Sequence, residues 1–81
     1  MVTSLLSTDD LRQARALVEE SGLSFEPPCQ DLVGIFEAGR LVAVGARQGR
    51  VLKMLAVAAS RQGSTLLDEV VTELVGRGFQ D

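Results

Sequence analysis

The sequence contains no histidine, tryptophan or tyrosine, and its only aromatic side chains are three phenylalanines. Without histidine or tyrosine, the usual acids for protonating a departing thiolate are absent, and no histidine can activate Cys29 as a nucleophile. A single cysteine also excludes a disulfide within the chain and is typical of a reducing cytoplasm. The sequence therefore predicts no catalytic residue and no metal-ligating cluster.

Positive charge and long apolar runs are also scarce. Eight basic residues stand against eleven acidic ones, and the basic residues are scattered, which argues against nucleic acid as a partner. No run approaches the roughly 18 apolar residues of a membrane span, and the N-terminus has no basic region of the kind that opens a signal peptide. We therefore expect a cytoplasmic protein that binds neither nucleic acid nor a membrane.

The chain has 81 residues, enough for one small domain, and 46% of them are hydrophobic, enough for a packed core. Its strongest pattern begins with the run Val51–Val57, which is apolar on both faces and predicts an interior strand covered on two sides. The pattern assigns Leu52, Met54 and Ala56 to one face and Val51, Leu55 and Val57 to the other.

A loop over residues 58–65 follows this strand and leads to a helix predicted over Leu66–Val75. The loop carries Arg61, Gln62 and Gly63, and backbone N–H groups at the start of a helix favour an anionic ligand. An ordinary strand-to-helix turn is the alternative interpretation. The helix has an apolar stripe, predicted to be its buried face, made of Leu66, Leu67, Val70, Val71, Leu74 and Val75.

The first third of the chain predicts a short edge strand over Val2–Leu6 and then a helix that ends at about Ser21. Ser7 and Asp10 have the spacing of a capping box at its start. Gly22 is placed to take the left-handed conformation that follows many helices.

The loop 24–30 contains Pro27-Pro28 and predicts either a simple crossover or the border of a binding cleft. Gly34 and Gly45 lie inside the strands that follow, where they mark a close backbone approach or a bulge. Short turns join these strands, so neighbours should be antiparallel. The strands are predicted over Leu32–Glu37, Leu41–Arg47 and Val51–Val57, with turns at Ala38–Arg40 and Gln48–Arg50.

Two charged residues in this meander allow more than one interpretation. Lys53 interrupts an apolar strand, and it either attracts an anionic ligand or forms a structural ion pair with Glu37. Glu37 is conceivable as a general base, but its place at a hairpin end favours exposure to solvent.

Five ordered stretches give the chain a recognisable resemblance, which runs from about Leu17 to its end. The segments Val33–Gly39, Leu41–Gly45, Gly49–Val57, Gln62-Gly63 and Val71–Leu74 resemble the N-terminal domain of [citrate (pro-3S)-lyase] ligase, a domain of the GNAT N-acetyltransferase type. The resemblance implies an α/β (α+β) half-fold of order β-α-β-β-β-α with an antiparallel meander, truncated before the later strands of the superfamily. We expect residues 1–81 to form one such domain.

The family also implies a chemistry. The complete ligase uses ATP and acetate to acetylate the prosthetic-group thiol of the citrate lyase acyl-carrier subunit. That ATP-dependent step belongs to a C-terminal nucleotidyltransferase-type domain with a histidine motif, and this chain has no histidine. The resemblance therefore implies a chain that lacks the ATP-using domain.

Coenzyme A or acetyl-CoA is the cofactor that a GNAT-type domain implies. The superfamily loop reads Gln/Arg-x-x-Gly-x-Gly/Ala; Gly63 matches it, whereas Ser60 and Thr65 depart from it. The branched side chain of Thr65 would crowd a pyrophosphate close to the backbone, so we expect weak binding. The residues expected to contact the cofactor are Leu55, Ala56, Val57, Arg61, Gln62, Gly63, Ser64 and Thr65.

The leading hypothesis is an accessory or binding module of a citrate lyase ligase that is not catalytic alone, with acyl-CoA and the acyl-carrier subunit as its partners. One alternative is an acyl-CoA-dependent N-acetyltransferase. Another is a module that self-associates into a homodimer through an open sheet edge, because an unpaired edge strand invites pairing with a second chain.

Overall fold

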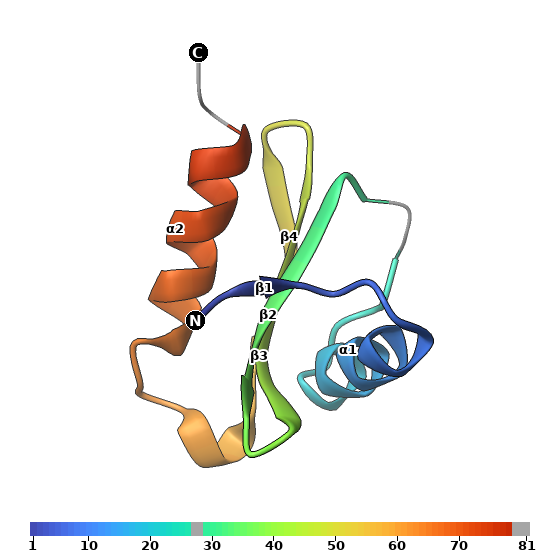
Figure 1. The fold of residues 1–81 in the computed structure, drawn as a ribbon, viewed down its shortest axis with the longest axis vertical. Helices are drawn as coiled ribbons and strands as arrows, with labels where there is room; N and C mark the ends of the chain where they lie inside the picture. Colours follow the sequence, from blue (N-terminus) through green and yellow to red (C-terminus); the bar gives the residue numbers. More distant parts are fainter. Residues whose placement is uncertain (27–28, 79–81) are drawn as a thin grey trace.

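The computed structural model describes residues 1–26 and 29–78, in which two helices enclose one antiparallel sheet (Figure 1). The strand order is β1-β2-β3-β4, and α1 and α2 cover opposite faces. This architecture confirms the predicted α/β order with its meander; the Pro27-Pro28 loop and the Phe79 tail lie outside the described residues. The elements are β1 (Thr3–Ser4), α1 (Thr8–Glu20), β2 (Asp31–Glu37), β3 (Arg40–Gln48), β4 (Val51–Val57), the 3-10 turn η1 (Ala59–Arg61) and α2 (Leu66–Gly78).

The ends of α1 are fixed by the residues that the sequence indicated. The Ser7 hydroxyl accepts a hydrogen bond from the backbone N–H of Asp10 at 3.0 Å, and the Asp10 carboxylate accepts one from the N–H of Ser7 at 3.3 Å. Gly22 has φ +83°, and the N–H of Leu23 donates back to the carbonyl of Val18 at 3.2 Å. These contacts satisfy backbone groups that a helix end leaves free, and they confirm the predicted helix.

The strand β3 forms the centre of the core because it is buried along nearly its whole length. A bulge at its start places two consecutive residues, Val42 and Ala43, on the face of α2. Leu41 and Val44 lie on the face of α1. The two hydrophobic clusters therefore share this strand, and each helix closes one of them.

The strand β4 has the predicted bounds, but it is the outermost strand of the described sheet, so the prediction of an interior strand is wrong. It is apolar on both faces because α1 and α2 both extend over it. Its face assignment also needs correction: Leu52 lies with Leu55 and Val57 on the side of α2. The cause is a bulge at Met54, whose φ is +56° and which shifts the alternation by one residue.

The helix α2 differs from the prediction in its length and in its buried stripe. It continues through Gly78 instead of stopping at Val75, and Arg77 in its last turn is held by Glu73, Asp31 and Ser4. Its buried residues are Leu66, Val70 and Leu74, whereas Leu67 and Val71 are half-buried and Val75 is 39% exposed.

The two strand glycines confirm the expectation of close approach and bulges. A Cβ at Gly34 would stand 2.6 Å from the backbone oxygen of Ala43. A Cβ at Gly45 would stand 2.6 Å from Val70 and 2.7 Å from Leu55, and Gly45 lies opposite the bulge of β4. Any larger residue at these positions would push β3 or α2 away.

A pair of valines on α2 tests this packing. Val70 is completely buried, so Val70→Ala should lower the free energy of unfolding by about 2 kcal/mol, because two methyl groups are lost and a cavity remains. Val75→Ala, on the same helix but exposed, should change it by less than about 0.5 kcal/mol. Urea denaturation measures both, and equal shifts of the midpoint would contradict the arrangement.

Candidate functional site

The predicted cofactor residues lie at the end of β4 and in the connection to α2. Ala56 is buried on the side of α1, and Leu55 and Val57 are half-buried on the side of α2. Past η1 the chain is exposed, and Gly63 has φ +82° with nothing within 4 Å of the position of a Cβ. The structure thus brings strand end, turn and helix start together as one continuous surface.

A cavity of about 260 Å³ lies beside this surface, on the side of α1. Of the predicted cofactor residues, only Val57 and Gln62 line it. The Gln62 side-chain amide donates to the carbonyl of Val57 at 3.1 Å, so Gln62 folds back over the outer edge of β4. The other lining residues, which sequence reasoning missed, come from α1, the residue that follows it, and η1: Leu17, Glu20, Ser21 and Ala59.

The outer edge of β4 carries backbone groups that no strand of the described sheet pairs. The N–H of Ala58 donates to the carbonyl of Val42, towards β3, so the groups of Val57 and Leu55 alternate to the outer side. The bulge at Met54 divides this edge, and Lys53 stands beside the bulge. Bulges and lysines are features by which edge strands avoid pairing with other chains.

The charges around the start of α2 oppose an anion more than the sequence suggested. Asp68 and Glu69 occupy the first turn, where their carboxylates already complement the helix dipole. Arg61 in η1 pairs with Glu37 at 3.0 Å. The shallow groove on this side is lined by Thr65, Asp68, Glu69, Thr72 and Glu73 and is therefore acidic.

The expected ion pair between Lys53 and Glu37 is wrong. Glu37 ends β2, at the end of the sheet where β4 also finishes, so it meets Arg61 in η1. Lys53 lies early in β4, and its ammonium donates to the backbone carbonyl of Glu26 at 2.9 Å. Arg61 of the predicted loop and Glu37, the conceivable general base, therefore form an ion pair with each other.

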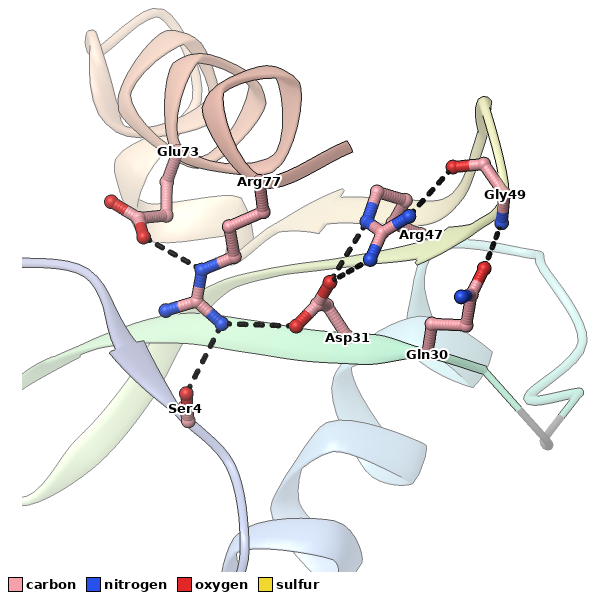
Figure 2. A network of polar contacts seen from close by, with 7 residues as sticks. All are labelled: Ser4, Gln30, Asp31, Arg47, Gly49, Glu73 and Arg77. Carbon is pink, nitrogen blue, oxygen red and sulfur yellow. Dashed lines mark hydrogen bonds and ion pairs between the residues drawn. The ribbon is translucent and has the colours of Figure 1, made fainter. Parts of the chain in front are cut away.

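A polar network on the opposite end of the sheet was not predicted (Figure 2). The Asp31 carboxylate accepts hydrogen bonds from Nε and Nη2 of Arg47 at 2.8 and 2.5 Å, and from Nη1 of Arg77 at 3.2 Å. Arg77 also donates to Glu73 at 2.7 Å and to the hydroxyl of Ser4 at 3.2 Å. The network therefore joins β1, β2, β3 and α2. The hydrogen bonds from Arg47, above all, hold the pKa of Asp31 below its ordinary value.

The described part of the chain gives little support for a metal site, a cysteine nucleophile or a membrane-spanning helix. Within residues 1–26 and 29–78, no three metal-ligating side chains gather into a possible ion site. Burial raises the pKa of the Cys29 thiol, which opposes the thiolate that a nucleophile needs. In these same ranges no helix has both the length and the apolar character needed to cross a membrane.

Comparison with known proteins shows the fold. No protein-family model matches the chain, and a search of curated proteins gave no match. A solved structure from meticillin-resistant Staphylococcus aureus, described as a protein of unknown function and "Probable Acetyltransferase", matches with a TM-score of 0.73 and 18% sequence identity. The match covers 96% of this chain and 70% of that one. The GNAT-like fold expected from the sequence is therefore confirmed.

The Asp31 network gives a prediction about pH. Because the folded-state pKa of Asp31 lies below its ordinary value of 3.8, its contribution to stability is complete above that value and is lost as the pH falls through the folded-state pKa. Asp31→Asn should therefore cost about 1–3 kcal/mol at pH 7 and progressively less below pH 4. Glu19→Gln is the control, because Glu19 is an exposed carboxylate within α1. Urea denaturation across pH gives the comparison, and a cost for Asp31→Asn that persists unchanged at pH 2 would refute it.

Proposed function

We propose that residues 1–81 form a single acetyltransferase-type module that binds the pantetheine arm of an acyl-CoA along the end of β4 and does not catalyse transfer alone. The observation that carries the proposal is the outer edge of β4 at Leu55 and Val57, which no described strand pairs and where only the Gln62 side chain meets the Val57 carbonyl, beside the cavity that both residues line. A pantetheine arm contains two amide groups, and an extended amide chain suits an unpaired strand edge. The shared fold with a structure described as a probable acetyltransferase supports this class of ligand.

The charges of the site define how coenzyme A would bind. Asp68 and Glu69 oppose a pyrophosphate at the start of α2, and Arg61 is engaged by Glu37. The branched side chain of Thr65 stands in the same turn. The favourable contacts are therefore those of the neutral pantetheine arm, and the phosphates contribute little.

A titration of the isotope-labelled chain tests this. We expect backbone amide shifts at residues 55–65 with both coenzyme A and pantetheine, and dissociation constants within about threefold of each other, because exposed charges interact weakly. The variant carrying Asp68→Asn and Glu69→Gln should bind coenzyme A several-fold more tightly and leave pantetheine unchanged. Asp9→Asn on α1 is the matched control. Shifts elsewhere while this segment stays silent would overturn the site.

The absence of transfer is measured in the same samples. Acetyl-CoA mixed with a panel of amines should release no thiol above the rate without protein, because the sequence supplies no histidine or tyrosine and the site places Glu37 in an ion pair. Robust thiol release would favour an acyl-CoA-dependent N-acetyltransferase instead.

The resemblance to citrate lyase ligase supplies a finer form of the proposal. In that form the pantetheine-type arm is the prosthetic group of the citrate lyase acyl-carrier subunit, and the module presents its thiol to another domain. The carrier with its prosthetic group should then shift the same amides as pantetheine, whereas the carrier without it should not.

Self-association through the outer edge of β4 is a second candidate, because that edge has no neighbouring strand among the described residues. The bulge at Met54 leaves only short straight segments for such pairing, so we expect a weak dimer. Sedimentation equilibrium at micromolar concentration decides the question. Lys53→Val should strengthen a real edge dimer, and a monomer mass for both chains would eliminate it.

A further inference from the structure

A separate cavity of about 360 Å³ lies where the connection from β1 to α1 diverges from the start of β2. This volume is near the lower end for small-molecule sites. Leu5 and Leu32 belong to the hydrophobic cluster beneath it, while Leu6 is 83% exposed and Leu11 is 40% exposed. Its apolar lining is formed by Leu5, Leu6, Leu11, Phe25, Cys29 and Leu32.

None of the six side chains of this apolar lining carries a charge. Because burial raises the pKa of the Cys29 thiol, that side chain is neutral at pH 7 and behaves as a small apolar group. The two exposed leucines face the cavity from the β1–α1 connection and from the first half of α1. An apolar body placed here would cover both.

The polar rim of the cavity consists of Ser4, Gln30, Asp31 and Arg77. Its acceptor oxygens are already engaged: both carboxylate oxygens of Asp31 receive arginine donors, and Oε1 of Gln30 receives the N–H of Gly49 (Figure 2). Some of its hydrogen-bond donors, in contrast, have no partner among the described residues. Among residues 1–26 and 29–78, no protein group accepts a hydrogen bond from Nε2 of Gln30, Nη2 of Arg77 or the Ser4 hydroxyl.

The charges of this rim balance. Asp31 and Glu73 offset Arg47 and Arg77, so this polar rim has no net negative charge. The nearby Asp10 carboxylate is engaged by the backbone N–H groups of Leu6 and Ser7. The remaining donors, one of them on a guanidinium, match a group that only accepts hydrogen bonds, and a carboxylate is such a group.

We propose that this cavity binds a small carboxylic acid with an apolar tail, with the tail against Leu6 and Leu11 and the carboxylate at the donors of Ser4 and Arg77. This site is distinct from the end of β4 and does not depend on the function proposed above. It gives the chain a second ligand, of the free-acid class.

Octanoate, used below its micelle concentration, is the probe. Amide shifts in the isotope-labelled chain should concentrate at residues 4–6, 11 and 29–32, with residues 55–65 unchanged. Octylammonium has the same tail and a donor head, so it should bind at least about tenfold more weakly, since the charge-assisted hydrogen bonds are lost. Equal affinity for the two amphiphiles, or shifts scattered over the surface, would overturn the proposal.

Two serine variants localise the tail. Leu11→Ser should weaken octanoate binding about fivefold through lost apolar contact, while Leu23→Ser should leave it unchanged, because Leu23 is similarly exposed at 44% but does not line the cavity. If Leu11→Ser lowers the urea midpoint, Leu6→Ser replaces it, because a side chain 83% exposed contributes little to folding. Equal weakening by the cavity variant and by Leu23→Ser would also contradict the site.

Discussion

The burial of β3 on both faces is the constraint on which the rest of the structure depends. Leu41 and Val44 pack under α1, while Val42 and Ala43 pack under α2, so neither helix closes its cluster without this strand. In a chain of 81 residues the core has little surplus, and both faces must be covered at once. Gly45 completes the arrangement, because only its missing side chain lets Val70 and Leu55 meet above the strand.

The two bulges, at Val42 in β3 and at Met54 in β4, determine which side chains lie at each end of the sheet. The bulge at Val42 carries β2 one residue further along β3, and this places Asp31 opposite Arg47. The bulge at Met54 turns the second half of β4 so that Leu55 and Val57 face α2 while Ala56 faces α1. Bulges often occur beside functional sites because they redirect side chains and interrupt pairing. The candidate surface at the end of β4 begins beside the bulge at Met54.

The fold followed from the sequence because its signals are local. The capping residues of α1, the glycine turns and the bounds of β4 were each visible in a few neighbouring residues. The errors arose where tertiary context intervenes: apolar faces on β4 indicated flanking strands, whereas two helices supply the cover. The ion pair of Glu37 with Arg61, and that of Asp31 with Arg47, depend on strand direction and on an unsignalled bulge. Hence the strand, turn and helix of the predicted cofactor segment followed from the sequence, but the charges around that segment did not.

Those electrostatics separate the two ends of the molecule by ligand chemistry. At the start of α2, the acidic side chains of Asp68 and Glu69 occupy the place where a phosphate would gain from the helix dipole, so a neutral chain of amides fits that end better than a polyanion. At the start of β2, Arg47 and Arg77 donate to both carboxylate oxygens of Asp31, and hydrogen-bond donors beside them remain without a protein acceptor. A ligand group that accepts hydrogen bonds therefore fits there. A thioester arm and a free acid differ in the groups that they present to the protein. The thioester arm presents amides and no charge near the reacting carbon, whereas the free acid presents a carboxylate. The two proposals therefore assign different acyl chemistry to the two ends of the sheet: a thioester arm at the end of β4 and a free carboxylate at the start of β2.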